Sequence, residues 1–160
     1  MSTPADGTPW SVRPATAGDE SQWRDLYAGY RDFYALEPDS AVVDRVWSWI
    51  RDPAHETRAF VAATADGELA GLAHVRRFAR PSSGTTGLWL DDLFTRPDLR
   101  GAGIGRLLVE AVSTVAAEEK LSVVRWITDE HNATARRLYD TVATATPWVT
   151  YDRSVESSSS

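Results

Sequence analysis

The sequence predicts a mixed α/β (α+β) fold, in which a central, mixed but mostly antiparallel sheet of six to seven strands is flanked by about four helices. Two observations predict it. Strand-like runs follow one another in the middle of the chain, and beyond residue 88 strand-like and helix-like segments alternate. A length of 160 residues with 42% hydrophobic and 25% charged residues suits one globular domain around one core.

The first third of the chain predicts one strand and two aromatic helices. The strand covers residues 10–15, WSVRPA. A helix over 19–34 follows, because large apolar side chains recur at offsets of three and four: Trp23, Leu26, Tyr27, Tyr30, Phe33 and Tyr34. A second helix over 40–50 repeats this pattern, and we expect Ser40 to cap its N-terminus.

The middle of the chain predicts three strands. Residues 58–64 and 69–78 are apolar and β-branched, and the Asp66-Gly67 pair between them is typical of a tight hairpin turn. A third strand covers 88–95. It leads into a turn that is rich in glycine.

The last third predicts a helix, a strand, a helix and a strand. The first helix has one apolar face, made by Ile104, Leu107, Leu108, Ala111, Val112 and Val115. A strand over 122–128 precedes a helix over about 131–143, whose stripe is Ala135, Leu138, Tyr139 and Val142. A final strand covers 147–153. Residues 1–9 and 154–160 lack an apolar pattern and are expected to be flexible tails on a single domain over 10–153.

Composition excludes several classes of function. A formal net charge of -6 without a block of basic residues argues against nucleic acid as a partner. Because there is no cysteine, disulfides and thiolate nucleophiles are excluded, and His74 and His131 lack metal-ligand spacing, so we assign them neither a metal nor a base role. We expect no metal, no membrane partner and a cytoplasmic location, because neither a signal segment nor a long apolar run is present.

Three glycines indicate an anion site by their position. Gly101, Gly103 and Gly105 lie where a strand ends and a helix begins, so backbone N–H groups and the helix dipole converge there. Glycine also lets a ligand approach the backbone, because no Cβ intervenes. The turn is therefore suited to phosphate oxygens. The alternative is that the glycines only permit a tight strand-to-helix turn.

Two common phosphate motifs do not match this turn. A Walker loop needs Lys and then Ser or Thr after its last glycine, but Gly105 is followed by Arg106 and Leu107. The dinucleotide fingerprint needs a third glycine at position 106 or 108, where Arg106 and Leu108 stand.

Residues 100–105, RGAGIG, instead fit the pattern Arg or Gln, any two, Gly, any, Gly or Ala. This resembles the acetyl-CoA-binding motif of the Gcn5-related N-acetyltransferases (GNAT). Residues 90–108 are similar to that family's fourth strand and third helix, and 128–143 resemble its later motif, in which Asn132 precedes Tyr139 by seven residues. The resemblance spans about 11–153. One departure is that the segment after Tyr139 lacks the Gly-Phe of many members.

The resemblance implies a GNAT fold with splayed fourth and fifth strands, acetyl-CoA as the cofactor, and a homodimer. It places the cofactor on Asn132, on the backbones of three strand residues and on the glycine-rich turn. Those positions are Leu93, Phe94 and Thr95 in the strand, and Arg100, Gly101, Ala102, Gly103, Ile104, Gly105 and Arg106 in the turn.

The same resemblance suggests catalytic roles. Strand alternation sends Asp91 and Asp92 to opposite faces, so we expect at least one to be shielded, with a raised pKa that suits a base. The resemblance favours Asp91 as the base or as the residue that binds the amine, and Asp92 is the second candidate for this role. Alternatively, either aspartate caps a loop or pairs with an arginine. Tyr139, a phenol with a pKa near ~10, is the expected acid for the leaving thiolate, and its alternative role is a core residue.

Acceptor residues are expected on the first two helices, which wall the acceptor pocket in this family. Aromatic faces with nearby carboxylates suit an ammonium group. The candidates on these helices are Tyr27, Tyr30, Tyr34 and Trp47, and Trp126 of the later strand is a further candidate. The alternative is that these are core residues. Residues 126–139 are most similar to the branch of the family that acts on small amines, polyamines and amino acids, so the resemblance implies a primary amine of such a small molecule as the acceptor. Because the chain has no cysteine, we expect the acetyl group to pass directly to this amine. The alternatives are a protein lysine or N-terminal acetyltransferase, which needs an open peptide groove, and a catalytically silent acyl-CoA-binding sensor.

Overall fold

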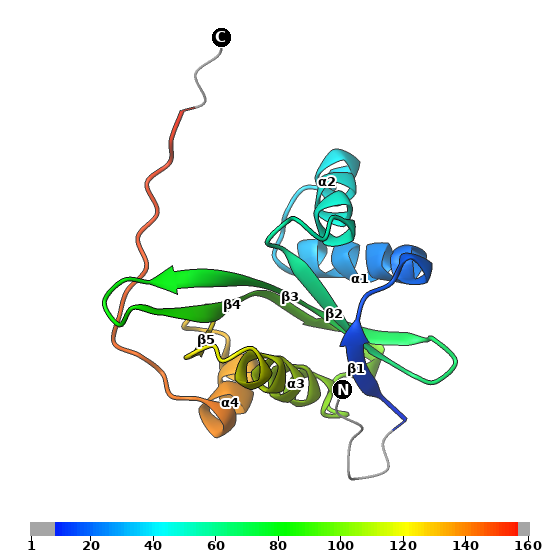
Figure 1. The fold of residues 1–160 in the computed structure, drawn as a ribbon. Coiled ribbons are helices and arrows are strands. Elements are labelled where there is room, and N and C mark those ends of the chain that lie inside the picture. The colour runs from blue at the N-terminus through cyan, green and yellow to red at the C-terminus, as the bar shows by residue number, and fades with distance from the viewer. Residues whose placement is uncertain (1–8, 157–160) are drawn as a thin grey trace. The chain divides into compact units, whose positions relative to one another are not determined.

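The computed structural model of the chain describes residues 9–156, which divide into two compact units (Figure 1). One unit runs to Ile127 and contains the sheet; the other begins at Thr128 and contains the last helix. Most of each tail predicted over 1–9 and 154–160 lies outside the described residues.

The first unit is built on a five-stranded sheet with the order β1-β2-β3-β4-β5. Its first four strands are antiparallel neighbours: β1 (Ser11–Pro14), β2 (Arg58–Ala63), β3 (Leu69–Arg80) and β4 (Thr85–Thr95). The short β5 (Val124–Arg125) pairs with β4 in parallel. A mixed, mostly antiparallel sheet is thus confirmed, but the prediction of six to seven strands is wrong for the described residues.

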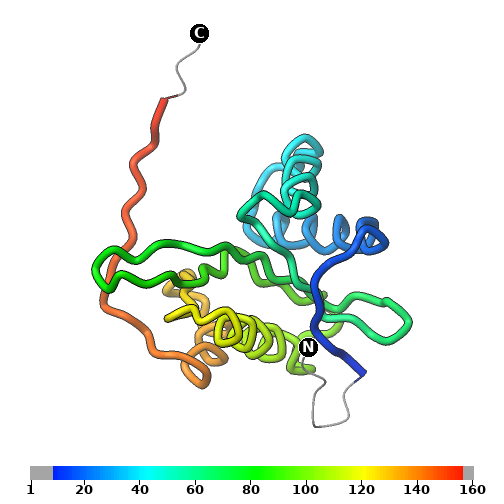
Figure 2. The backbone as a smooth tube through the Cα atoms, in the orientation of Figure 1, coloured from blue at the N-terminus to red at the C-terminus, as the bar shows by residue number. Residues whose placement is uncertain are grey.

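The strand predicted over 147–153 does not form. This segment has no regular secondary structure, and Figure 2 draws it as an extended trace in orange and red. The side chains of Trp148, Val149 and Tyr151 are 83%, 75% and 91% exposed. A β-branched and aromatic sequence favours a strand only when a neighbouring strand supplies the ladder and the packing surface.

Three helices of the first unit cover the two faces of its sheet (Figure 1). The helices α1 (Glu20–Phe33) and α2 (Ser40–Arg51) lie on one face, and α3 (Ile104–Glu118) lies on the other. Two 3-10 turns, Ala17–Asp19 and Pro97–Leu99, precede α1 and α3. The fourth helix, α4 (Ala133–Val142), belongs to the second unit. Four α-helices therefore agree with the prediction.

The cap of α2 is Asp39 and not Ser40, as the sequence had suggested. The backbone of Asp39 is extended, and its Oδ1 accepts hydrogen bonds from the N–H groups of Ala41 and Val42 at 3.0 and 3.3 Å. Ser40 is already the first helical residue. A carboxylate at this place also complements the positive end of the helix dipole.

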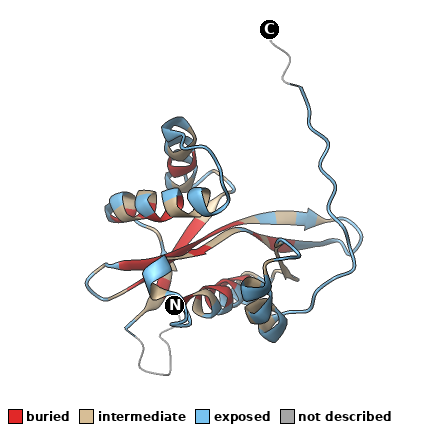
Figure 3. Cartoon of the chain, turned by 180° about the vertical axis from the view of Figure 1, so that it is seen from behind, coloured by how far each residue is buried: buried red, intermediate tan, exposed pale blue. Residues whose placement is uncertain are grey.

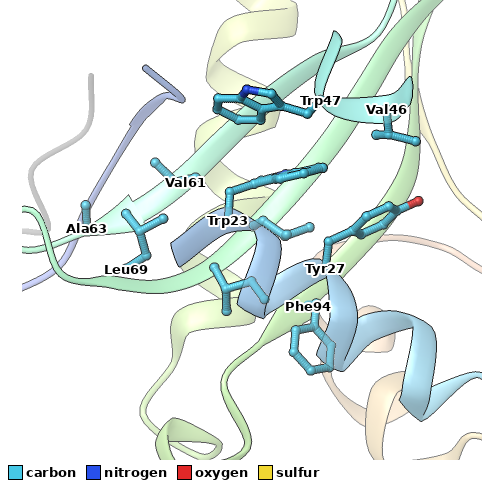
Figure 4. Packing of buried hydrophobic residues seen from close by; sticks show 10 residues of the cluster. Trp23, Tyr27, Val46, Trp47, Val61, Ala63, Leu69 and Phe94 are labelled. Atoms are coloured by element: carbon cyan, nitrogen blue, oxygen red, sulfur yellow. The ribbon is translucent and has the colours of Figure 1, made fainter. Parts of the chain in front are cut away.

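Helices on both faces explain why most of β2 and the first seven residues of β3 are buried (Figure 3). On the α1 face, Trp23 packs at the centre of a cluster with Tyr27, Trp47 and Phe94 (Figure 4). On the α3 face, Ile104, Leu108 and Val112 are buried, and the first two lie close to Gly71 of β3. The sheet is therefore the middle layer of three.

Close packing of this middle layer makes Gly71 sensitive to substitution. A Cβ at this position would lie 2.6 Å from the carbonyl oxygen of Phe94 and 3.1 Å from Ile104. Because the first of these is backbone, it cannot move aside at low cost. We expect Gly71→Ala to lower the free energy of unfolding by about 1–3 kcal/mol in urea titrations.

Gly18→Ala is the matched control, because the nearest atom to its new Cβ is the Thr16 hydroxyl at 3.9 Å. We expect the unfolding free energy of this variant to stay within about 0.5 kcal/mol of wild type. Equal effects of the two substitutions would contradict the packing described for Gly71.

Candidate active site

The two predicted acidic residues lie at a bulge in β4. His74 of β3 is paired with Asp92, but the next residue, Val75, is paired with Leu90, which leaves Asp91 as the extra residue. Strand alternation was expected to send the two carboxylates to opposite faces, and this expectation is wrong. Asp92 contacts His74 and Asp91 contacts Arg76. Since residues two apart in β3 share a face, both carboxylates lie on the α1 face.

Asp92 is the more enclosed of the two carboxylates, with 17% of its side chain exposed. Its Oδ2 lies 2.7 Å from Nδ1 of His74, and the phenol groups of Tyr27 and Tyr30 also hydrogen-bond to it. Burial pushes the pKa of Asp92 upward, but the bonds from His74, Tyr30 and Tyr27 outweigh it and hold that pKa below its usual range. Asp92 is therefore a stable anion.

Asp91 has a different environment, with 35% of its side chain exposed. It accepts a hydrogen bond from Nε of Arg76 at 3.0 Å, and the guanidinium of Arg76 also lies over the ring of Trp89. Desolvation raises the pKa of Asp91, and the charge of Asp92 adds to this, while Arg76 opposes it. Asp91 is thus the more exposed aspartate and pairs with an arginine, which was one of the alternatives, whereas the pKa of the more shielded Asp92 is lowered and not raised as expected.

His74 is the residue that sequence reasoning missed. It was given no role, yet its buried ring joins Asp92 of β4 to Trp23 of α1, whose Nε1–H donates to His74 Nε2 at 3.0 Å. The available signal was a histidine inside an apolar strand. Regular pairing from the Arg80–Thr85 end of the hairpin would place His74 opposite Asp91, so only the bulge brings it to Asp92.

The predicted acceptor residues on α1 form an aromatic row beside these carboxylates. The rings of Tyr27 and Tyr30 stack with centroids 5.6 Å apart, and Tyr34 continues the row at 4.8 Å from Tyr30. Burial decreases along the row from Tyr27 to Tyr34, which is exposed. Figure 4 shows the Tyr27 oxygen pointing away from Leu69 and Ala63.

The other two predicted acceptor residues lie elsewhere. Trp47 of α2 is buried against Trp23, with ring centroids 5.0 Å apart, so it is a core residue of the first unit. Trp126 directly follows β5 and is partly buried. The structure does not bring Trp47 into the row formed by Tyr27, Tyr30 and Tyr34.

The glycine-rich turn has the backbone that the sequence suggested. Gly101 and Gly103 have φ angles of 87° and 83°, in the left-handed region, and no atom lies within 4 Å of a Cβ built on either. Gly103 starts α3 without a side-chain cap, so the N–H groups of Ile104 and Gly105 have no intrahelical partner. This open, donor-rich turn fits the phosphates of acetyl-CoA.

Neighbouring elements shape the approach to this turn. The guanidinium of Arg100 lies over the rings of Phe33 and Phe94, at 5.1 and 5.6 Å from their centroids. The parallel ladder between β4 and β5 contains the pairs Leu88–Val124 and Trp89–Arg125. Within the described residues, β4 from 90 to 95 has no partner in β5, and the predicted residues Leu93, Phe94 and Thr95 lie in that stretch.

The second unit contains the other two predicted site residues. Asn132 caps α4, because its Oδ1 accepts a hydrogen bond from the N–H of Ala135 at 3.1 Å. Tyr139 is partly buried and shares the less exposed stripe of α4 with Ala135, Leu138 and Val142, as predicted. Asn132 is therefore at least the N-cap of α4, and its contact with the cofactor stays a prediction.

The described residues form neither a metal site nor a membrane-spanning helix. Among residues 9–156, no cluster of three or more His, Asp or Glu side chains has a geometry that would hold a metal ion. In the same part of the chain, no helix has the length and apolar character to cross a membrane.

Comparison with known proteins gives one family. Residues 22–142 match the sequence model described as the acetyltransferase (GNAT) family. The D-amino-acid N-acetyltransferase HPA3 of Saccharomyces cerevisiae is 29% identical over 143 residues, which cover 89% of each chain. An aminoglycoside N(6')-acetyltransferase type 1 of Stenotrophomonas maltophilia is 31% identical over 106 residues, or 64% of each chain.

Solved structures give the same fold. A possible acetyltransferase from Clostridium difficile 630 aligns with a TM-score of 0.80 at 14% identity, covering 94% of this chain and 100% of that one. At this identity the likeness describes the fold alone.

The tyrosines next to Asp92 predict a loss of stability in alkali. Burial, followed by the charge of Asp92, raises the pKa of Tyr27 to about 12 and also raises that of Tyr30. The stabilisation from such a raised pKa is complete below pH 10 and is lost as pH approaches 12. We expect the unfolding free energy in urea to fall by about 1 kcal/mol for Tyr27 between pH 9 and pH 11.

Tyr27→Phe serves as the comparison for this measurement, because it removes the ionisable group and keeps the ring. Its unfolding free energy should fall less over the same pH range. An equal fall in both proteins would show that Tyr27 ionises normally.

Proposed function

The chain belongs to the GNAT family of acetyl-CoA-dependent N-acetyltransferases, and we propose that its acceptor is the primary amine of a small cationic molecule. The observation that carries this proposal is the carboxylate pair at the β4 bulge, on the same face as the tyrosine row of α1. An ammonium group gains from both, through charge attraction and through contact with aromatic faces.

The two carboxylates suit different tasks. Asp92 is held as an anion by three donors, so it supplies a fixed charge that attracts the ammonium form of the acceptor. Asp91 is more exposed and its pKa is raised, which brings it closer to the range of an effective base. We assign Asp91 to take the proton from the amine, directly or through a water, and Asp92 to bind the amine.

Acetyl-CoA supplies the activated acetyl group as a thioester. We propose that its phosphates bind the turn over 100–106, with Asn132 and the backbones of Leu93, Phe94 and Thr95 as further contacts. The open positions at Gly101 and Gly103 and the uncapped start of α3 support the turn's role. The stretch of β4 beyond Trp89, which has no β5 partner in the described chain, supports the strand's role.

Proton transfers by side chains then balance the reaction. Asp91 accepts one proton from the ammonium group, and the neutral nitrogen forms a bond to the acetyl carbon as the carbon–sulfur bond breaks. Tyr139 gives its phenol proton to the departing sulfur, because a phenol and a thiol have comparable pKa values, and the second proton of the nitrogen, released as the amide forms, passes through water to the tyrosinate. The chain contains no cysteine, which favours direct attack over an acyl-cysteine intermediate.

The relatives suggest which acceptors to test. One is described as acting on D-amino acids and the other on aminoglycosides, and both classes carry small primary amines. Two alternatives are a peptide acetyltransferase and a catalytically silent acyl-CoA-binding sensor. The predicted homodimer and cytoplasmic location stay predictions.

Release of CoA from acetyl-CoA tests this proposal across polyamines, D- and L-amino acids, aminoglycosides and a histone-tail peptide. We expect turnover on at least one small amine, and a fall in kcat of at least tenfold, or about 1.4 kcal/mol, in Tyr139→Phe, because the variant lacks the acidic proton.

Tyr151→Phe is the matched control, because this tyrosine is 91% exposed, and its kcat should equal that of wild type. Turnover confined to the peptide would favour the peptide acetyltransferase. Saturable acetyl-CoA binding without turnover on any acceptor would favour the silent sensor. Wild-type kcat in Tyr139→Phe would remove Tyr139 as the acid while keeping the enzyme.

A further inference from the structure

His74 has no assigned part in the proposed reaction, although it lies next to Asp92. Its ring is buried in β3 and contacts Trp23 and Tyr27 of α1 as well as Asp92 of β4. A buried imidazole needs partners for both nitrogens, and both are present here. Trp23 Nε1 lies 3.0 Å from His74 Nε2, and Asp92 Oδ2 lies 2.7 Å from His74 Nδ1.

These two hydrogen bonds define where the imidazole proton sits. An indole N–H can only donate, so Nε2 of His74 must offer its lone pair to Trp23. The ring proton is then on Nδ1, where it is donated to the carboxylate of Asp92. The two hydrogen bonds together fit a neutral His74 ring in the Nδ1–H tautomer.

The neutral ring matters for the charge that the acceptor meets. An imidazolium at 2.7 Å would cancel the charge of Asp92, whereas the neutral ring donates a hydrogen bond and leaves that charge in place. The phenols of Tyr27 and Tyr30 also favour the anionic form of Asp92. The 17% exposure of Asp92 shows that part of it can be reached.

We propose that His74 is a positioning residue: Trp23 locks it as the neutral Nδ1–H tautomer, and in that state it orients Asp92 as the fixed anion that binds the acceptor ammonium group. This inference rests on the proposed function, because it deepens the role given to Asp92 there. An apolar side chain would fill the same place in β3 without the cost of burying a polar ring, which favours a role beyond packing.

The tautomer is tested first, by long-range ¹H–¹⁵N NMR of the histidine rings in the full chain without ligands. The His74 signals are assigned by their absence in His74→Leu. We expect a protonated Nδ1 and an unprotonated Nε2 in wild type at pH 7. Trp23→Phe, which keeps an aromatic ring but lacks the N–H, should lose this pattern.

Trp47→Phe is the matched control for the tautomer, because Trp47 packs in the same cluster against Trp23, on the side away from Tyr27, whereas it is Trp23 that donates to the histidine. The His74 pattern should persist in this variant. A wild-type ring that is protonated on Nε2, or on both nitrogens, would overturn the proposal.

Steady-state kinetics test the consequence for the acceptor. His74→Leu should raise KM for the amine at least about tenfold, while KM for acetyl-CoA changes by less than about threefold. His74→Asn should keep KM for the amine within about threefold of wild type, because its amide N–H replaces the Nδ1–H donor to Asp92. This rescue separates positioning from packing, since Asn fills the core less well than Leu.

Failure of the inference differs from failure of the proposed function. An amine-active wild type with unchanged amine KM in His74→Leu, or with equal losses in the Leu and Asn variants, overturns the role of His74 alone. A wild type that acetylates no small amine overturns the proposed function, and the role of His74 with it. If His74→Leu does not fold, the same kinetics are measured on Trp23→Phe, which lacks the N–H that donates to His74. The same increase in KM for the amine is then expected.

Discussion

The bulge at Asp91 is the constraint on which the candidate site depends. In a regular β3–β4 ladder, successive residues of β4 would face opposite sides of the sheet, and one aspartate would point toward α3. The extra residue at the bulge reverses which residues of β4 face which side of the sheet. Leu88 and Leu90 are buried before the bulge, and Asp92 and Phe94 face α1 after it. A single backbone irregularity thus places two carboxylates together beside the tyrosines of α1.

The site and the core of the first unit share residues, which couples stability to function. Trp23 is fully buried at the centre of the aromatic cluster, and its indole N–H is also the donor that satisfies His74. Tyr27 packs on Trp23 and hydrogen-bonds Asp92. The cost of burying an imidazole and a carboxylate is offset because each polar atom has a partner. The carboxylates and tyrosines of the candidate site are therefore held by the packed core, whereas the glycine-rich turn is open.

Local sequence signals predicted the helices, the first four strands and the glycine-rich turn, because each depends on neighbours in sequence. Helical offsets define α1 and α3, and only glycine readily takes the positive φ angles at 101 and 103. Features that depend on distant partners were not predicted. His74 and Asp92 are 18 residues apart and meet through one bulge, and residues 147–153 have strand-like composition without a ladder partner in the described chain.

The central claim is that Asp91 and Asp92 form one acceptor site with divided roles. The most direct measurement is kcat and KM for the best small amine in Asp91→Asn and Asp92→Asn, side by side at neutral pH. The account predicts a fall in kcat of at least about tenfold in Asp91→Asn, and a rise in amine KM of at least about tenfold in Asp92→Asn. Wild-type kcat/KM in both variants would contradict it.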